Sequence, residues 1–372
     1  MSTIPRIIIV QSHGKIGGAQ LQCLDILRSL RTKSQIAVVF IFNGPAVKLY
    51  CDEGFRCICL SNKNNPSILS SIKLYFRFSR VMKSLEPNLI FCHSSLASYL
   101  ARLYNILNKN KVVYTVHGWP WRGFVLPLRV LYMTLEKVFI YFNAAHYILV
   151  CNDSKKEASH SLGDRWVSRM NYNIIHNGVT QIGSIKAKKK RSISNILFAA
   201  RVDRSKNHNR VLEWFSNTAM DCKLILAGCF TDSRSFKKQA ESIVKQKINK
   251  IEFLGHVNNM RTVYDNSDIL LHISHFETFP MVILEAMSVG IPVIANAKGG
   301  ISEIVSSDTG CLLDNDSVIC IEQAISELND SSKYAEVSYN CSQLIKKKFS
   351  KNIMISKTEK LLLELIESHS KK

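Results

Sequence analysis

Two glutamates in one stretch of the sequence, residues 268–292, are spaced so that both could serve a ligand. Glu277 follows an apolar, strand-like segment, and Glu285 lies within a segment that Pro280 opens and Gly290 ends, as in a helix. A carboxylate only accepts hydrogen bonds, so both side chains suit the hydroxyl groups of a ribose or a sugar. The alternative for each glutamate is an ordinary capping or surface role.

A pair of cations follows another apolar segment, residues 195–200. Arg201 offers a planar fork of donors and Lys206 a point charge, so together they could neutralise a departing diphosphate. Taken alone, either residue would be regarded as a surface charge.

Glycines stand near several of the apolar segments, where a backbone can approach a phosphate closely because glycine has no side chain. Loop amides at the start of a helix also bind anions. A turn required only by the path of the chain is the alternative for each of these glycines, which are Gly17, Gly18, Gly228, Gly299 and Gly300.

His117 follows the Val-rich segment 111–116 and precedes a glycine, so its imidazole is expected at the end of a strand. This position favours a functional role over that of an ordinary core or surface histidine. Trp119 and Trp121 could stack on a sugar ring, or they could pack against a neighbouring helix.

Together these motifs resemble those of the retaining GT-B glycosyltransferases of family 4. Glu277 and Glu285 match the family's E-x7-E signature, and Arg201 and Lys206 match its Arg-x4-Lys diphosphate clamp. Asn207 stands where the family usually has a glycine. The resemblance covers nearly the whole chain. It implies two doubly wound, Rossmann-like domains that face each other across a cleft, with the donor site mainly in the C-terminal domain.

The resemblance also assigns roles to individual residues. Catalytic roles fall to Arg201, Lys206, Glu277 and His117. Within the donor-binding set, His256 and Val257 are expected beside the nucleotide base and Glu285 at the ribose. The donor-binding residues are Gly17, Gly18, Asn177, Gly228, His256, Val257, Phe279, Pro280, Met281, Glu285, Gly299 and Gly300.

The implied reaction is transfer of a sugar from a nucleotide-diphosphate sugar, with a UDP-sugar as the expected donor, by front-face attack of the acceptor hydroxyl. Such a reaction needs no enzyme nucleophile, and the sequence offers no convincing Ser-His-Asp or Cys-His arrangement. Stabilisation of the leaving diphosphate and positioning of the sugar would supply the catalysis. No cofactor and no metal site are expected. A sugar-nucleotide epimerase of the same fold and a non-catalytic sugar-nucleotide-binding module are the alternatives.

To position these residues the chain must alternate strands with helices, and its apolar pattern predicts this alternation. Short, β-branched apolar segments are separated by segments with helical periodicity, which is typical of an α/β fold with parallel sheets. The expected strands are residues 6–10, 35–42, 88–92, 111–116 and 145–151 in the first half, and 195–200, 223–227, 251–254, 269–274 and 292–295 in the second.

A chain of 372 residues is longer than one hydrophobic core usually organises, so two domains are expected. The expected boundaries are an N-terminal, acceptor-side domain over residues 1–185, a basic linker over 186–192 and a donor-side domain over 193–349. Residues 350–372 should form a helix that packs back on the N-terminal domain.

The formal net charge of +20 and the pI of about 9.5 predict a positive field that attracts phosphates or anionic lipid. No zinc-finger, helix-turn-helix or RNA-binding pattern is visible, so nucleic acid is not an expected partner. No apolar segment is long enough to span a bilayer, and the eleven scattered cysteines fit a reducing compartment.

These features predict a cytoplasmic protein, peripheral to the inner face of the plasma membrane. The usual substrates of the resembling family add a glycan or lipid-linked acceptor in polysaccharide or lipopolysaccharide synthesis. A helix expected over residues 68–85 interleaves basic with apolar residues, so it could rest on anionic lipid. An ordinary amphipathic helix with a cationic solvent face is the alternative. The basic residues are Lys73, Arg77, Arg80 and Lys83.

Overall fold

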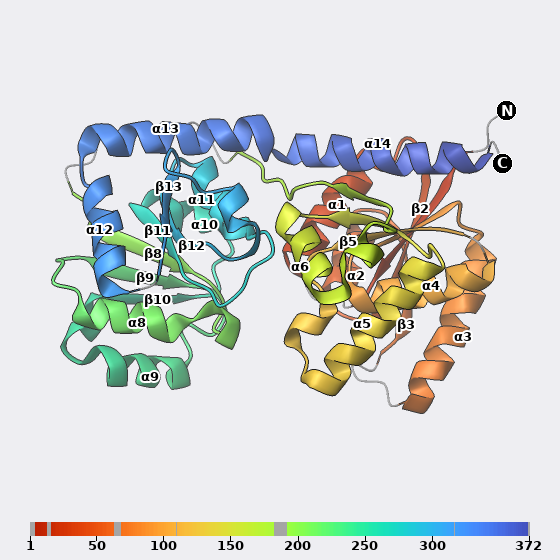
Figure 1. Ribbon diagram of the computed structural model, residues 1–372, viewed down its shortest axis with the longest axis horizontal. Helices are drawn as coiled ribbons and strands as arrows, with labels where there is room; N and C mark the ends of the chain where they lie inside the picture. The colour runs from red at the N-terminus through yellow and green to blue at the C-terminus, as the bar shows by residue number, and fades with distance from the viewer. Residues whose placement is uncertain are drawn as a thin grey trace. The chain divides into compact units, whose positions relative to one another are not determined.

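The structure is a computed structural model, and it describes residues 4–12, 16–62, 68–108, 110–181, 192–315 and 317–370 (Figure 1). Contacts within the chain divide it into an N-terminal unit, Met1–His176 with Met354–Lys372, and a C-terminal unit, Asn177–Ile353. The linker expected over residues 186–192 lies almost wholly outside the described residues.

The N-terminal unit is built on a parallel sheet of seven strands in the order β3-β2-β1-β4-β5-β6-β7. Parallel neighbours require a crossover connection, and helices provide these crossovers. The strands are β1 (Arg6–Gln11), β2 (Gln35–Phe42), β3 (Arg56–Ser61), β4 (Leu89–Cys92), β5 (Lys111–Val116), β6 (His146–Leu149) and β7 (Tyr172–Ile174).

Helices cover both faces of this sheet, because successive strand residues point to alternate faces and both sets are apolar. Ile7 and Ile9 of β1 pack on the side of α1 (Gly18–Leu30), α2 (Pro45–Asp52) and α14 (Lys351–Ser370). Ile8 and Val10 pack on the side of α3 (Ile68–Leu85), α4 (Ser95–Asn108), α5 (Leu126–Tyr141) and α6 (Asn152–Leu162). Two short elements complete this unit, the 3₁₀ helix η1 (Pro120–Gly123) and α7 (Asp164–Val167).

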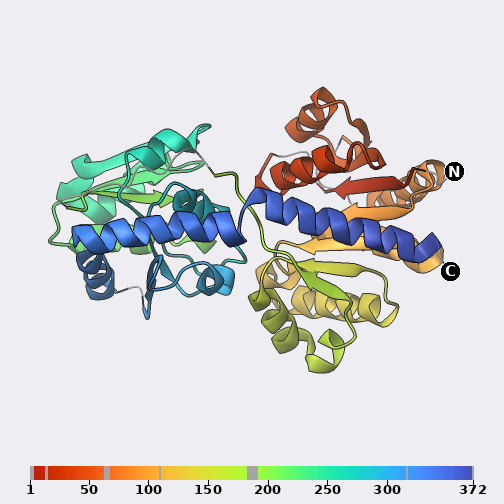
Figure 2. The same cartoon turned by 90° about the horizontal axis from the view of Figure 1, so that it is seen from above.

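The last helix, α14, belongs to the core of the N-terminal unit. Its residues Met354, Leu361 and Leu362 are buried with the side chains of α1 and α2. Figure 2 shows α14, in blue, lying across the strands of the N-terminal sheet. The ammonium group of Lys111, at the start of β5, also contacts the carbonyl oxygen of Leu365.

The C-terminal unit has a second parallel sheet, of six strands in the order β10-β9-β8-β11-β12-β13. The strands are β8 (Asn195–Ala199), β9 (Lys223–Ala227), β10 (Ile251–Gly255), β11 (Ile269–His272), β12 (Val293–Asn296) and β13 (Gly310–Leu313). The helices are α8 (His208–Asn217), α9 (Arg234–Val244), α10 (Met260–Asp265), α11 (Met281–Ser288), α12 (Val318–Leu328) and α13 (Ser331–Lys348), with 3₁₀ helices η2 (Arg204–Lys206), η3 (Lys245–Lys250) and η4 (Gly299–Glu303).

The two doubly wound units confirm the architecture expected from the alternating pattern. All ten expected strands are present, with small differences at their ends. The structure adds three strands that the pattern did not reveal, β3, β7 and β13, and each lies at the edge of its sheet.

A charged pair is buried in the N-terminal unit between α4 and α5. Arg102 and Glu136 have fully buried side chains, and the guanidinium contacts both carboxylate oxygens. The Tyr147 hydroxyl donates to Glu136 at 2.8 Å, and the guanidinium lies 4.2 Å from the ring centroid of Phe139. The pair thus has the hydrogen-bond partners that buried charges need.

In the described part of the chain, no helix combines the length and the apolar character that crossing a membrane requires.

Candidate active site

The predicted residues of the C-terminal unit gather at the carboxyl edge of its sheet. Arg201 and Lys206 follow β8, Glu277 follows β11 and Gly299 follows β12. These three strands are neighbours in the sheet, so the loops that follow them are also neighbours. In an open parallel sheet, ligands bind outside this edge.

The loop after β8, residues 200–207, is held in shape by its own polar groups. Asp203 accepts hydrogen bonds from the amide of Ser205 at 2.9 Å and from its hydroxyl at 2.7 Å. Asn207 follows with a left-handed backbone, φ 52° and ψ 41°. Asparagine tolerates this conformation better than most residues other than glycine. Asn207 therefore supplies the backbone geometry that a glycine would supply at this position.

Lys206, Glu277 and His272 form a cluster at this edge, which we call the Lys206 cluster. Lys206 Nζ contacts Glu277 Oε1, and His272 Nε2 lies 3.0 Å from the same oxygen. Glu277 and His272 are buried. Arg201 is instead 66 % exposed and lies 3.6 Å from the carboxylate of Asp203. The structure thus pairs Lys206 directly with Glu277, and places Arg201 in the same loop as Lys206 with a longer contact to a different carboxylate.

Burial and hydrogen bonding act in opposite directions on Glu277. Burial alone would raise its pKa, but the hydrogen bond from His272 and the charge of Lys206 outweigh burial, so the pKa lies below its ordinary value. Glu277 is therefore ionised at neutral pH and forms an ion pair with Lys206. The amide of His275 donates to the carbonyl oxygen of Ser205 at 2.9 Å, which ties the loop of Glu277 to the loop of Lys206.

Glu285 lies in α11, on the helix that the sequence predicts, and its partner comes from α10. The Tyr264 hydroxyl donates to Glu285 Oε2 at 2.9 Å. Burial raises the pKa of Glu285, and the hydrogen bond from Tyr264 opposes this shift. The ionised form of Glu285 would therefore gain from further donors, such as the hydroxyl groups of a ribose.

Gly228 lets the loop after β9 approach the loop that carries Arg201. Its φ is +139°, in the region that favours glycine, and a Cβ here would lie 2.2 Å from the carbonyl oxygen of Ala200. No rearrangement of a flexible side chain could relieve this contact, because it is with backbone. Gly228 is thus required by the shape of the site.

Gly299 and Gly300 bring the loop after β12 against the loop of Glu277. The φ of Gly299 is +60°, and a Cβ there would lie 2.0 Å from the carbonyl oxygen of Glu277. The amide of Gly300 donates to the carbonyl oxygen of Thr278 at 2.8 Å, so this amide holds the two loops together.

Phe279, Pro280 and Met281 form the start of α11, with Pro280 at its N-cap. Phe279 is buried against Phe349, with ring centroids 5.5 Å apart. Asn177 donates from its Nδ2 to the carbonyl oxygen of Phe279 at 3.1 Å. These contacts give Phe279 and Asn177 packing roles within the C-terminal unit, and their donor-binding roles stay predictions.

His256 and Val257 directly follow β10 at the same carboxyl edge. His256 is exposed, and its Nδ1 lies 3.6 Å from the Sγ atom of Cys229 in the loop after β9. Val257 is half-buried. Both residues are therefore placed where a ligand outside the sheet edge could reach them.

A hollow of about 640 Å³ lies beside the loop after β8. Its size is within the range usual for small-molecule sites. It adjoins the loop of Arg201 and Lys206 and the residue two positions before Glu277. The lining residues are Val202, Asp203, Arg204, Asn207, His208, Asn209, Phe236, Gln239 and His275.

In the N-terminal unit, His117 follows β5, and a second histidine joins it. His93 follows β4, and its Nδ1 lies 3.3 Å from His117 Nε2. Burial lowers the pKa of His117 to about 4. Burial and the nearby His117 also lower the pKa of His93 well below its ordinary value. Both imidazoles are therefore uncharged at neutral pH, and His117 can take part in a hydrogen bond but cannot supply a positive charge.

Gly17 and Gly18 begin α1 at the carboxyl end of β1. Gly17 is the N-cap, with an extended backbone of φ −158°, and Gly18 is the first helical residue. A Cβ on Gly17 would lie 3.1 Å from Oε1 of Gln20. Residues 13–15 of the same loop lie outside the described residues, so the predicted glycine loop is seen only in part.

Trp119 and Trp121 are core residues, exposed by only 3 % and 1 %. Their rings stack on each other with centroids 4.7 Å apart, and Trp119 Nε1 donates to the carbonyl oxygen of Ser154 at 2.7 Å. Packing against a neighbouring helix therefore holds for both, and stacking on a sugar is wrong.

Sequence reasoning missed the side chains that form hydrogen bonds to Glu277, Glu285 and His117, namely His272, Tyr264 and His93. A signal was available for the two histidines, because His272 ends β11 and His93 directly follows β4. That is the position that singled out His117. Tyr264 offered no such signal, since it lies within a helix and 21 residues before its partner Glu285.

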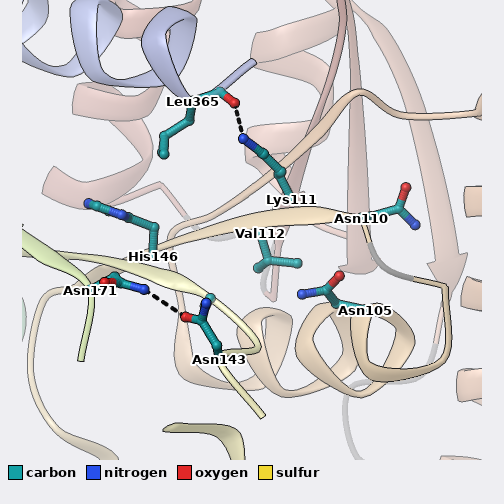
Figure 3. Close-up of a pocket in the computed structure, with 9 residues that line it drawn as sticks. Asn105, Asn110, Lys111, Val112, Asn143, His146, Asn171 and Leu365 are labelled. Carbon is teal, nitrogen blue, oxygen red and sulfur yellow. Dashed lines mark hydrogen bonds between the residues drawn. The ribbon is translucent and has the colours of Figure 1, made fainter. Parts of the chain in front are cut away.

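A polar pocket of about 270 Å³ lies away from all of the predicted residues, at the amino end of β5 and β6 in the N-terminal unit (Figure 3). Two amide groups in the pocket donate hydrogen bonds, one to another amide and one to the backbone. Asn171 Nδ2 donates to Asn143 Oδ1 at 2.8 Å, and Asn105 Nδ2 donates to the carbonyl oxygen of Ala144 at 2.8 Å. The pocket is therefore not part of the candidate active site.

Comparisons with known proteins agree with this geometry. The family model described as Glycosyltransferase Family 4 matches residues 16–180, and the model described as Glycosyl transferases group 1 matches residues 183–343. The chain is 25% identical over 317 residues to the O-antigen biosynthesis glycosyltransferase WbnH of Escherichia coli, which covers 82% of this chain and 85% of that one. It is 22% identical over 389 residues to the UDP-Gal:alpha-D-GlcNAc-diphosphoundecaprenol alpha-1,3-galactosyltransferase of Escherichia coli, with 95% and 98% covered.

Among solved structures, that of Anabaena Alr3699/HepE in complex with UDP-glucose is similar, with a TM-score of 0.78 at 19% identity over 96% of this chain and 99% of that one. This likeness shows that the fold is GT-B. The two family models follow each other along the chain and together leave only its ends and a short connection unmatched. The two halves of the chain therefore both match glycosyltransferase families, the C-terminal half the group 1 family, and the fold is GT-B.

Proposed function

We propose that this protein transfers a sugar from a nucleoside-diphosphate sugar, with a UDP-sugar as the donor, to a hydroxyl group of a glycan or lipid-linked acceptor. The reaction is proposed to retain the anomeric configuration, to need no metal ion and to serve the synthesis of an envelope polysaccharide or lipopolysaccharide. Relatives named for O-antigen and capsular polysaccharide biosynthesis support this assignment. Similar structures that hold UDP and UDP-glucose support the class of donor.

The Lys206 cluster carries the proposal. Two cations, Arg201 and Lys206, stand in one loop at the carboxyl edge of a parallel sheet, and an ionised, buried Glu277 directs one of them. The pairing holds the Lys206 ammonium group in place before a substrate arrives. A preorganised charge of this kind stabilises negative charge that develops in a transition state without the penalty of reorganisation.

In the proposed reaction, the oxygen of the acceptor hydroxyl forms a bond to the anomeric carbon on the face from which the diphosphate leaves. The bond between that carbon and the diphosphate oxygen breaks, and its electron pair stays on the diphosphate. The acceptor proton passes to the departing diphosphate oxygen. Arg201 and Lys206 stabilise the charge on the diphosphate, so no side chain needs to act as a nucleophile.

The remaining groups are proposed to position the donor. Glu277 accepts a hydrogen bond from a sugar hydroxyl, and Glu285 accepts hydrogen bonds from the ribose. His117 of the N-terminal unit is proposed to meet the sugar as a neutral hydrogen-bonding group, which agrees with its lowered pKa. The resemblance to the retaining GT-B glycosyltransferases of family 4 is the basis for the proposed donor-binding roles of Gly17, Gly18, His256 and Val257.

The test is to incubate the protein with UDP-, GDP- and ADP-sugars and acceptor analogues, and to measure nucleotide release. We expect release only when both a donor and an acceptor are present, and an unchanged anomeric configuration in the product by NMR. Conversion of the donor into a different nucleotide sugar would instead identify an epimerase. Saturable nucleotide binding without any turnover across the panel would identify a binding module.

We also propose that the protein works at the inner face of the plasma membrane as a peripheral protein, because its +20 charge favours anionic surfaces.

A further inference from the structure

The helix α5 has an unusual outer face, because the side that points to solvent is apolar. Val130 and Leu131 are 53 % and 50 % exposed, and they belong to a run of exposed apolar side chains along the helix. The other members are Phe124, Val125, Leu126, Leu128, Leu135, Val138, Tyr141 and Phe142.

The inner face of α5 is apolar as well, apart from one charge. Phe139 and Ile140 are buried against the sheet, together with the paired Glu136. A helix of a globular protein normally buries one apolar stripe and exposes polar residues on the other side. A helix that is apolar all round is usually buried all round, so the outer face of α5 lacks a partner within this unit.

The neighbouring helices extend this surface. The helices α3, α4 and α5 cover the same face of the N-terminal sheet, and Figure 1 shows them together on one side of it. On α4, Leu103 and Leu107 are exposed, and on α3, Ile72 and Phe76 are exposed. We call the outer surface of these three helices the α3–α5 face.

The charge of the α3–α5 face has one sign. The helices α3 and α4 contain no acidic residue, and the single acidic residue of α5, Glu136, is buried. Six basic side chains of α3 and α5 are exposed or half-buried, namely Lys73, Arg77, Arg80, Lys83, Arg129 and Lys137. The helix α6 on the same side of the sheet carries Asp153 and Glu157, and both form ion pairs with Arg122.

We infer that the α3–α5 face docks on an anionic membrane surface, with the apolar side chains of α5 entering the boundary between headgroups and acyl chains. Exposed aliphatic and aromatic residues beside basic ones are what such a boundary binds. A second copy of this chain is a poorer occupant, since the two faces would bring their uncompensated positive charges together.

The sequence pointed to α3 as the helix that could rest on lipid, whereas in the structure α3 and α5 contribute different groups to the α3–α5 face. In α3, Leu74 and Phe78 lie in the core, so this helix is an amphipathic helix with a cationic outer face. It supplies charge, together with Ile72 and Phe76. The apolar contribution comes mainly from α5.

This surface goes beyond the proposed reaction, but the chain connects the two. His117 is followed by η1 and then by α5, so the segment that carries the predicted sugar-contacting histidine leads directly into the α3–α5 face. Docking would bring this end of the N-terminal unit to the lipid surface, where a lipid-linked acceptor resides.

Flotation of the full-length protein with vesicles tests the inference, using phosphatidylcholine alone and phosphatidylcholine mixed with phosphatidylglycerol. We expect binding to the mixed vesicles and little to the neutral ones. A charge variant, Lys73→Gln with Arg77→Gln, Arg80→Gln and Lys83→Gln, should bind roughly 600-fold more weakly, because each of the four basic residues contributes roughly fivefold. An apolar variant, Leu131→Gln with Leu135→Gln and Val138→Gln, should bind at low salt but be released by much less salt than wild type.

Matched controls lie in the C-terminal unit. Lys333→Gln with Lys346→Gln, Lys347→Gln and Lys348→Gln removes the same number of exposed charges from α13, and Ile319→Gln with Tyr339→Gln removes exposed apolar groups. Both should bind vesicles like wild type. The thermal shift on adding UDP should be unchanged in all variants, which separates a failure of docking from a failure of the proposed function.

Three outcomes would overturn the inference. These are wild-type protein that does not float with anionic vesicles, controls that lose binding as much as the α3–α5 variants do, and a wild-type dimer in sedimentation analysis that the apolar variant converts to a monomer. The last outcome would assign the face to a second copy.

Discussion

At the scale of residues, Lys206 and Arg201 differ in how firmly they are held. Lys206 is fixed by a buried carboxylate, whereas Arg201 is mostly exposed beside Asp203. We expect Lys206→Ala to lower kcat by about 10²-fold or more, as for the loss of one preorganised charge-stabilising donor. Arg201→Ala should have a similar effect, because the developing charge of the diphosphate is shared between them. Steady-state kinetics with donor and acceptor in excess measures both.

The matched control for this prediction is Arg261→Ala. Arg261 is also ion-paired in the C-terminal unit, with Asp265 at 2.8 Å, but it lies on α10 outside the loop after β8. It should retain activity within a few-fold of wild type. Near-normal turnover in both Lys206→Ala and Arg201→Ala would remove the two cations from the mechanism.

The two glutamates should respond to pH in opposite senses. The pKa of Glu277 is lowered in the folded protein, so its contribution to stability is present at neutral pH and is lost as the pH falls through that pKa. The pKa of Glu285 is raised, so its contribution is present at low pH and is lost as the pH rises through that pKa. Thermal unfolding from acidic to neutral pH should therefore show Glu277→Gln as the more destabilised variant at neutral pH.

Measurements of ligand binding should also distinguish Glu285 from Glu277. At neutral pH without nucleotide, Glu285→Gln should unfold no earlier than wild type, since it removes an unfavourably buried charge. With UDP it should bind at least about tenfold more weakly, because hydrogen bonds to a charged group are lost. Glu277→Gln should instead reduce kcat more than UDP affinity. Unchanged UDP affinity in Glu285→Gln would show that this carboxyl group serves only the fold.

The sequence was enough to select the charged residues of the candidate site but not to pair them. Arg201, Lys206, Glu277 and Glu285 follow from motif spacing, which reflects short stretches of chain. The contact between Lys206 and Glu277 joins positions 71 residues apart, and it depends on β8 and β11 being neighbours. Periodicity in one segment carries no information about which strand lies beside it.

At the scale of elements, the loop after β9 depends on Gly228. We expect Gly228→Ala to destabilise the C-terminal unit by about 1–3 kcal/mol or more, because the added Cβ meets the backbone of Ala200 and the positive φ is strained. The activity should fall by more than the loss of folded protein explains, since Ala200 directly precedes Arg201. Urea unfolding and kinetics on the same preparation measure the two effects.

Gly123→Ala is the matched control for this prediction. A Cβ on Gly123 would meet no atom within 4 Å, and its backbone does not need a positive φ. Its stability should therefore equal that of wild type or exceed it slightly, because alanine restricts the unfolded chain. A loss in Gly123→Ala as large as that in Gly228→Ala would contradict the assignment.

The three strands that the sequence pattern did not reveal have a common physical cause. The strands β3, β7 and β13 lie at sheet edges, where one side of the strand has no neighbour and burial is incomplete. Their sequences are correspondingly less apolar or very short, as in Tyr172–Ile174. Central strands are buried on both faces and therefore stand out as apolar runs.

At the scale of the whole molecule, the chain has two compact units, each built on its own sheet. UDP is expected to bind the C-terminal unit, while α14 completes the core of the N-terminal unit through Leu362. Leu362→Ala should cost about 2–5 kcal/mol, as for a fully buried leucine. Scanning calorimetry should show this loss in one transition and the stabilisation by UDP in another. A single transition that both changes move together would mean that the units unfold as one.

The buried pair of Arg102 and Glu136 has a consequence for how α5 is oriented about its own axis. Because both sides of this helix are apolar, burial of apolar surface does not distinguish one rotational register from another. Glu136 does, since only one rotation places its carboxylate against the guanidinium of Arg102. The pair therefore acts as an index that decides which side chains of α5 point outward.

Substitutions of Arg102 and Glu136 can separate the effect of this pair on the orientation of α5 from its effect on the stability of the protein. Arg102→Met alone should cost about 3–5 kcal/mol, because it leaves the charge of Glu136 buried without its partner. Arg102→Met with Glu136→Leu should recover most of that stability, since neither charge remains. In the double variant, α5 should nevertheless no longer have one fixed rotation about its axis. Hydrogen exchange would show this as faster exchange of the α5 amides in a protein that unfolds at a near-normal temperature. Slow, wild-type exchange in the double variant would mean that the shape of the surrounding core sets the rotation of α5 without help from the charges.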